Sequence, residues 1–230
     1  MKRSEINAII RSADAFIREM RFHLPPFAYW TPEEWGTKGK EVLEIVETQL
    51  GWDITDFGQG DFEKFGLFLF TVRNGKPDNL KTMEGKLYAE KLMIVDVDQI
   101  TPMHFHWNKA EDIINRGGGK LVIQLYNSAE DESLADTDVT VSTDGVVRTV
   151  KAGDKVVLSP GESITLPPYL YHQFWSTEER VLVGEVSMVN DDNLDNRFYE
   201  PIGRFPEIEE DEPPLYLLVG VYGRYYLVGG

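Results

Sequence analysis

The chain has 230 residues, and its 39 acidic side chains outnumber its 23 basic ones, which gives a formal net charge of −16. This charge and the lack of a basic block argue against a nucleic-acid partner and against binding to an anionic membrane surface. The absence of cysteine excludes disulfides, thiol nucleophiles and cysteine-ligated metal sites. Charged residues interrupt the first apolar stretch, and no apolar run approaches about 18 residues. We therefore expect no signal peptide, no membrane span and a cytoplasmic protein.

The N-terminal part of the chain is expected to be helical. Apolar residues at three- and four-residue spacing predict a helix over 4–20, with Ser4 as its N-cap. A capping-box pattern follows at Thr31-Pro32-Glu33-Glu34, with proline at the first helical position. Further apolar residues predict a second helix over 41–50. We therefore expect residues 1–58 to form a helical extension.

From residue 60 the pattern changes to short strands separated by turns. Turn signals include Asn74-Gly75 and Asp144-Gly145, and the glycine run 117–119 is also expected to be a turn. Many short strands at this spacing predict a mainly β sandwich or barrel. The predicted strands are residues 67–73, 88–97, 120–126, 139–142, 146–150, 155–158, 163–166, 172–175 and 181–187.

The simplest domain organisation is a single domain. Residues 59–214 are expected to form the β-barrel, with the helical extension 1–58 packed on it. The last segment, residues 215–230, is apolar and aromatic with glycine breaks, and it is expected to be an edge or interface strand.

The chain contains four histidines, His23, His104, His106 and His172. The spacing of His104 and His106 places both imidazoles on one face of a strand. Glu111 follows after a bend, and His172 lies in another strand-like stretch. Three imidazoles and a carboxylate suit a divalent ion such as Mn, Fe, Co, Ni or Zn. On spacing alone, two strand histidines in the core or facing solvent are an equal alternative, and His23 is expected to be a loop histidine.

Two blocks of sequence resemble the paired motifs of the cupin superfamily, in the expected order. They consist of His104-x-His106, Glu111 and Gly118, followed by Gly161, Pro167 and His172. Tyr169 stands where the family usually has glycine, and Ser176 where it often has asparagine. Those two positions shape a turn and a support rather than the metal ligands. The resemblance implies a double-stranded β-helix, or jelly-roll barrel, in agreement with the strand pattern.

Longer segments are similar to the D-lyxose isomerase family of cupins. The likeness covers residues 1–214 and is strongest at 88–91, 101–107, 111–119, 184–187, 190–192 and 197–206. It implies an Mn²⁺-dependent aldose–ketose isomerase that acts on D-lyxose and D-xylulose, with D-mannose and D-fructose as a secondary pair. It also implies a homodimer with a monosaccharide substrate. Co²⁺, Fe²⁺, Ni²⁺ and Zn²⁺ suit the same ligand set.

The chemistry of isomerisation suggests roles for two more residues. Four protein ligands, His104, His106, Glu111 and His172, leave two positions on a six-coordinate ion for O1 and O2 of an open-chain sugar. Isomerisation through a metal-bound enediol(ate) moves one proton between C2 and C1 and one between O2 and O1. Lys109, between two ligands, is expected to stabilise the enediolate or to donate a proton. Glu185 is expected to be the C1/C2 base, with a structural ion pair to Lys91 as the alternative.

The resemblance also suggests residues that bind sugar hydroxyls, although such residues are more often surface charges. They are Lys91, Asp192, Asp195, Arg197 and Arg204. Three other functions stay open at this point. A phosphosugar isomerase would need a cationic pocket, for which Lys91, Arg197 and Arg204 are the candidates. An Fe-dependent cupin dioxygenase can use the same ligands. A non-catalytic sugar-binding cupin has no use for an open metal site.

Overall fold

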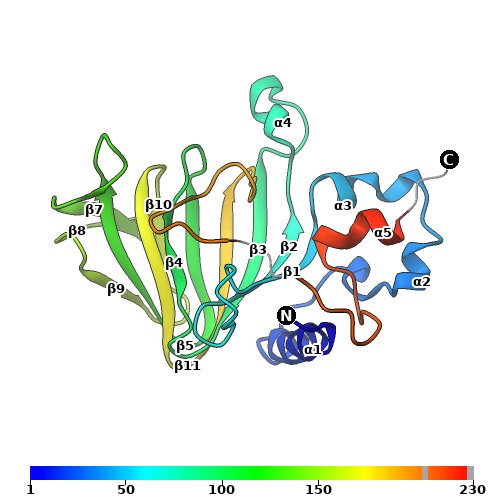
Figure 1. Ribbon diagram of the computed structural model, residues 1–230. Helices are drawn as coiled ribbons and strands as arrows, with labels where there is room; N and C mark the ends of the chain where they lie inside the picture. Colours follow the sequence, from blue (N-terminus) through cyan, green and yellow to red (C-terminus); the bar gives the residue numbers. More distant parts are fainter. Residues whose placement is uncertain (204–206, 227–230) are drawn as a thin grey trace.

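The computed structural model describes residues 1–203 and 207–226, and it is mainly β, as predicted (Figure 1). The helices are α1 (Arg3–Glu19), α2 (Pro32–Trp35), α3 (Leu43–Glu47), α4 (Pro77–Thr82) and α5 (Tyr222–Tyr225), with 3-10 turns η1 (Pro26–Tyr29), η2 (Lys40–Val42) and η3 (Val219–Val221). The strands are β1 (Gly51–Thr55), β2 (Leu67–Arg73), β3 (Tyr88–Val95), β4 (Thr101–Phe105), β5 (Glu111–Ser128), β6 (Leu134–Ala135), β7 (Val139–Thr143), β8 (Val146–Val150), β9 (Lys155–Leu158), β10 (Ser163–Leu166), β11 (Leu170–Met188) and β12 (Arg197–Phe198).

The helical segments before β1 follow the sequence prediction in outline. The capping box is present, because Thr31 Oγ1 accepts from the Glu34 N–H at 3.2 Å and Glu34 Oε2 accepts from the Thr31 N–H at 2.8 Å. The predicted helix 41–50 is shorter and divided between η2 and α3. The predicted cap of α1 was wrong. That helix begins after Lys2, and Ser4 instead donates its backbone N–H and hydroxyl to Asp211.

Two long strands, β5 and β11, form the centre of the sheet. They pair antiparallel from Leu170↔Asn127 to Ser187↔Glu111, with a bulge near Thr177. The sequence predicted shorter strands here and assigned the glycines 117–119 to a turn. That assignment was wrong, because these glycines lie within β5. A Cβ at Gly118 would lie 1.9 Å from the Arg180 carbonyl oxygen, so the missing side chain lets β5 pass close to the bulge of β11.

The other strands complete a sheet in the order β1-β2-β3-β11-β5-β10-β7-β8 over the described residues. Strand β4 pairs with β11 and with the short β12, while β6 and β9 pair with β5. Strand β1, within the expected helical extension, was not predicted. All five of its residues are buried. Trp52 and Ile54 alternate with Asp53 and Thr55, but this pattern covers only five residues and directly follows the predicted helix 41–50.

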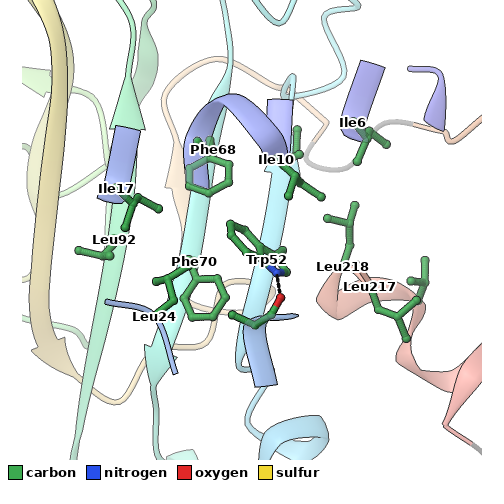
Figure 2. Packing of buried hydrophobic residues seen from close by; sticks show 14 of the residues in the cluster. Ile6, Ile10, Ile17, Leu24, Trp52, Phe68, Phe70, Leu92, Leu217 and Leu218 are labelled. Atoms are coloured by element: carbon green, nitrogen blue, oxygen red, sulfur yellow. Dashed lines mark hydrogen bonds between the residues drawn. The ribbon is translucent and has the colours of Figure 1, made fainter. Parts of the chain in front are cut away.

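Two apolar clusters lie on opposite faces of β2. Phe68 and Phe70 face α1 and the C-terminal segment, whereas Leu67 and Leu69 face the interior of the barrel. This alternation is the period-two geometry of a strand. Figure 2 shows the outer cluster, in which Trp52 of β1 packs beside Phe70 and donates its indole N–H to the Ala28 carbonyl at 2.5 Å. Some residues of the inner cluster, among them Leu67 and Leu69, line the cavity described below.

The segment from residue 215 to 226 does not form the predicted edge strand. It contains η3 and α5, and Leu218 makes only an isolated bridge to Trp52. Tyr222 is buried and donates its hydroxyl to the Leu50 carbonyl at 2.6 Å, so the segment packs into the outer cluster. Residues 227–230 of that prediction lie outside the described part of the chain. Among the described helices, none has both the length and the apolar character needed to cross a membrane.

Candidate metal centre and surrounding cavity

Three histidines meet inside the barrel. His104 on β4 lies opposite His172 on β11 in the strand register, and His106 follows the end of β4. All three side chains are buried, and the ligand nitrogens of the three rings lie within 4.8 Å of one another. The sequence-based expectation that these side chains gather is therefore met, and the group can hold a metal ion.

Each of the three imidazoles is oriented by a backbone carbonyl. The Nδ1 atom of His104 lies 2.7 Å from the Pro102 oxygen, that of His106 lies 2.7 Å from the Asp195 oxygen, and that of His172 lies 2.9 Å from the Leu170 oxygen. Because a carbonyl oxygen can only accept, we assign the proton of each ring to Nδ1. Each Nε2 then carries a free lone pair, as in histidines that bind metals.

Glu111, the first residue of β5, lies beside the three imidazoles. Its Oε1 lies 3.4 Å from His106 Nε2 and 3.2 Å from His172 Nε2. The Nε2 of His172 is buried and makes no hydrogen bond with any described residue. An unprotonated imidazole nitrogen and a carboxylate oxygen are both acceptors, so a cation between them removes their repulsion. The donor set therefore fits a divalent ion of the Mn–Zn series.

Burial favours the form of the histidines that such an ion requires. Burial, together with His172 and His106, lowers the pKa of His104 well below its ordinary value. The ring is therefore neutral, and a neutral ring is a metal ligand.

Lys109 lies between two buried carboxylates. Its Nζ is 2.7 Å from Glu111 Oε2 and 2.8 Å from Glu185 Oε1, and it donates to Asn190 Oδ1 at 3.0 Å. Burial acts to lower the pKa of Lys109, but Glu111 and Glu185 outweigh it and raise that pKa. Burial acts to raise the pKa of Glu111, but Lys109 and His106 outweigh it and hold that pKa well below the usual range. Lys109 and Glu111 therefore form a buried ion pair.

Glu185 has a second cation beside it. It lies on β11 in register with Lys91 on β3, whose Nζ is 3.7 Å from Glu185 Oε1 and 3.1 Å from Asp192 Oδ1. The Ser187 hydroxyl donates to the same Glu185 oxygen at 3.1 Å. Two ammonium groups and one hydroxyl thus hold this carboxylate in place. The ion pair with Lys91 that the sequence suggested is present together with one to Lys109.

His104, His106 and most of these polar groups line a cavity with an empty volume of about 510 Å³, which includes its opening to solvent. One part of the wall is polar and carries Lys91, Lys109, Glu111, Glu185, Asp192 and Asn196. The rest is largely apolar, with residues such as Phe57, Leu69, Met93, Phe174 and Phe198. The cavity can therefore bind a small polar molecule against one reactive side.

Asp195 lies behind this wall, contrary to the expectation of a sugar contact. Its Oδ1 accepts from the Asn108 N–H at 2.9 Å and its Oδ2 accepts from the Lys109 N–H at 3.0 Å. Its backbone carbonyl orients His106. Asp195 is therefore a positioning residue that joins the segment around residue 195 to a ligand and to Lys109.

Arg197 also points away from the cavity, contrary to the sequence expectation. Its Nε lies 2.8 Å from Glu132 Oε2, whereas the next residue, Phe198, lines the cavity and packs against His104 with ring centroids 5.4 Å apart. Successive side chains of a strand point to opposite faces, so the pairing of β12 with β4 decides this outcome. Arg204 lies outside the described residues.

Several residues of the site were not singled out from the sequence, among them three polar ones. Asn190 contacts Lys109, and Asn196 and Thr101 line the cavity. Thr101 and Asn190 lie in segments that resemble the family, but no pattern marked their side chains.

Comparison with known proteins places the chain in a family. A family model described as D-lyxose isomerase matches residues 1–222. A protein of Serratia proteamaculans named D-lyxose/D-mannose isomerase is 49% identical over 228 residues, which cover 98% of this chain and 99% of that protein. A protein of Escherichia coli O157:H7 with the same name is 48% identical and covers 98% of this chain and 100% of that protein.

The fold also matches solved structures. An L-ribose isomerase of Cellulomonas parahominis aligns with a TM-score of 0.59 and 14% sequence identity, over 91% of this chain and 98% of that one. An L-ribose isomerase of Acinetobacter sp. DL28 aligns with a TM-score of 0.56 and 18% identity, over 87% and 93% of the two chains. At such identities the likeness concerns the fold, and the predicted cupin-type barrel is confirmed. Because the family model and the two relatives at nearly half identity each span almost the whole sequence, the chain belongs to the D-lyxose isomerase family.

Proposed function

We propose that the protein is a metal-dependent aldose–ketose isomerase that interconverts D-lyxose with D-xylulose, and D-mannose with D-fructose. The observation that carries the proposal is the buried group of three histidines and Glu111 beside the Lys109–Glu185 pair. The name D-lyxose/D-mannose isomerase, borne by relatives at 49% and 48% identity, supports both sugar pairs.

The proposed metal ligands are His104, His106, His172 and Glu111. A divalent ion held by them would supply Lewis-acid polarisation of the carbonyl and the neighbouring hydroxyl of an open-chain sugar. We propose Mn²⁺ as the native ion on the basis of the family resemblance. A mixed set of imidazoles and one carboxylate is compatible with Mn²⁺, and Co²⁺, Fe²⁺, Ni²⁺ and Zn²⁺ suit the same set.

Lys109 is proposed to stabilise the negative charge that develops on the substrate oxygens. Its raised pKa keeps the ammonium protonated, because Glu111 and Glu185 outweigh the effect of burial. A cation that is buried and fixed before the reaction stabilises the transition state without reorganisation. Lys109 therefore acts as a cation rather than as a base.

Glu185 is proposed to carry the proton between C2 and C1. Its carboxylate takes the C2 proton of the aldose, which leaves an enediolate, and then delivers a proton to C1 of the enediolate to give the ketose. A second proton moves between O2 and O1. The contacts of Ser187 and Lys91 with Glu185 support this role because they fix the direction of the carboxylate.

Lys91 and Asp192 are proposed to bind sugar hydroxyls from the polar wall of the cavity. Their own contact at 3.1 Å orients both groups. The same contact weakens the case for a phosphorylated substrate. Among the described lining residues the lysines are Lys91 and Lys109, and both are paired with carboxylates.

Three further features are proposed, of which the family resemblance implies the second. They are a single domain in which the helices of residues 1–58 pack on the barrel 59–214, whose sheet β1 extends, a homodimer and a cytoplasmic location. Packing of α1 and the segment 215–226 on the outer face of β2 supports the single domain. Light scattering of the purified protein at several concentrations tests the dimer.

A panel of free and phosphorylated pentoses and hexoses, assayed with and without added Mn²⁺, tests the function. We expect conversion of D-lyxose and D-mannose that depends on the metal. Solvent deuterium should enter C1 of the ketose to the extent that the proton on Glu185 exchanges with solvent while the enediolate is bound. Conversion of phosphorylated sugars alone, or oxygen uptake with no effect of Mn²⁺, would replace the isomerase proposal with one of its rivals.

A further inference from the structure

Thr101 lines the cavity with a hydroxyl that lacks a partner. The residue is 2% exposed, and its Oγ1 makes no hydrogen bond with any described residue. Among the described residues that line the cavity, Thr55 carries the other hydroxyl. That hydroxyl has a partner, because it accepts a hydrogen bond from the Phe57 N–H at 2.9 Å. A buried hydroxyl without a partner destabilises the folded protein. Its presence in a ligand cavity is explained if the hydroxyl binds the ligand.

A bulge gives Thr101 its place in the wall. His104 of β4 pairs with His172 of β11, whereas Thr101 pairs with Phe174, so three steps on β4 match two on β11. Residues three apart on a regular strand point to opposite faces. The extra residue of the bulge puts Thr101 and His104 on the same face of β4 instead, and both line the cavity.

The surroundings of Thr101 indicate which ligand group it would meet. Its partner in the register, Phe174, is apolar and lines the same cavity, as do Leu69 and Met93. The lysines and carboxylates of the wall already contact one another at the polar side. A hydroxyl can both donate and accept, so it matches an alcohol better than it matches a charged group.

We propose that Thr101 binds one hydroxyl of the sugar beyond C2 and thereby takes part in sugar selection. This inference rests on the proposed function, which assigns the oxygens of C1 and C2 to the end of the cavity formed by the histidines, Glu111 and Lys109. The remaining hydroxyls of the open-chain sugar then lie along the rest of the cavity wall, which includes the unpaired hydroxyl of Thr101.

The variant Thr101→Val tests the proposal, because it keeps the shape of the side chain and removes only the hydroxyl. We expect kcat/KM for D-lyxose to fall about 5- to 150-fold, the effect of losing one hydrogen bond in a buried site. The melting temperature should stay unchanged or rise by about 2–4 °C, because an unpaired buried hydroxyl has been removed.

Thr143→Val is the matched control. Thr143 is 1% exposed and its Oγ1 also has no partner among the described residues, but it lies on β7 and does not line this cavity. Its substitution should affect the melting temperature as Thr101→Val does, and should leave kcat/KM unchanged.

Deoxy sugars identify the hydroxyl. With the 3-, 4- and 5-deoxy analogues of D-lyxose, the penalty of Thr101→Val should disappear for one analogue and persist for the others. Unchanged kcat/KM in Thr101→Val, or an equal penalty with every analogue, would overturn the assignment while the isomerase function stands. If the wild-type protein isomerises neither D-lyxose nor D-mannose, the proposed function fails and this inference fails with it.

Discussion

The side-chain amide of Asn74 forms hydrogen bonds with both the backbone N–H and the backbone carbonyl of Asn190. Its Nδ2 donates to the Asn190 carbonyl at 2.9 Å, and its Oδ1 accepts from the Asn190 N–H at 3.0 Å. Both residues are buried. The side chain of Asn190 in turn accepts from Lys109 Nζ at 3.0 Å. Asn74, which follows β2, therefore fixes a group that touches the proposed catalytic cation.

Removal of this amide should reduce turnover. In Asn74→Ala, Asn190 loses both backbone partners and Lys109 loses a fixed acceptor. We expect kcat to fall about 10-fold, which corresponds to about 1.4 kcal/mol, while the content of bound metal is unchanged. Steady-state kinetics and elemental analysis measure the two effects.

Asn127→Ala is the control. The amide of Asn127 binds Thr137 and Asp138 at an exposed site, so its removal should leave kcat as in the wild type. A loss of metal in Asn74→Ala would show that the amide supports the ligands instead.

The four histidines provide an internal control for the metal centre. His172→Ala removes one buried imidazole from the proposed ligand set, so the purified protein should lose most of its bound metal and its activity. His23 lies outside this cluster, and His23→Ala should keep both. Elemental analysis of the two variants after equal exposure to Mn²⁺ measures the difference. Equal metal content in the two variants would remove His172 from the ligand set.

The proposed base can be tested with a nearly isosteric change. Glu185→Gln should lower kcat about 10²- to 10⁴-fold, the usual contribution of a general base, and should retain bound metal. Glu90→Gln is the control, because Glu90 precedes Lys91 on β3 and pairs with Arg73 at 2.7 Å outside the cavity. Kinetics with D-lyxose distinguish the two variants. Turnover of Glu185→Gln near that of the wild type would make Glu185 a structural partner of Lys109 and Lys91.

Local sequence patterns predicted the parts of the site that depend on local geometry. The spacing of His104 and His106 determines a shared face on any strand, and the α1 stripe likewise follows from its period. Strand β1 was missed although Trp52 and Ile54 alternate with Asp53 and Thr55, because a five-residue pattern is a weak signal. The direction of Arg197 could not be predicted, since it depends on the pairing of Arg197 with Phe105 across two distant segments.

Contacts between distant polar residues were the least predictable. Asn74 and Asn190 are separated by 116 positions, and neither lies in a periodic pattern. The same holds for the start of α1. Ser4 has the chemistry of an N-cap, but the distant Asp211 takes its hydroxyl and backbone N–H. Such pairs form because the fold brings their segments together, which no local preference encodes.

The start of α1 carries an ion pair whose contribution to stability should depend on pH. Arg3 is fully buried, and it donates from Nε and Nη2 to the two carboxylate oxygens of Glu210, each at 2.8 Å. The hydrogen bonds from Arg3 lower the pKa of Glu210 in the folded protein. A carboxyl group with a lowered folded pKa stabilises the fold at pH values above its unfolded pKa, about 4.3 for glutamate, and loses that effect as the pH falls through the folded pKa.

Glu210→Gln should therefore be less stable than the wild type at neutral pH, and this difference should shrink as the pH falls below about 4. We expect a loss of about 1–2 kcal/mol at pH 7, because the variant leaves a buried guanidinium without its anion while the 39% exposure of the Glu210 side chain screens the pair. Urea unfolding at a series of pH values measures the difference. Glu209→Gln, at an exposed neighbouring position, controls for the change in net charge and should follow the wild-type profile. A stability gap that is constant from pH 7 to pH 3 would mean that Glu210 contributes through packing and not through its charge.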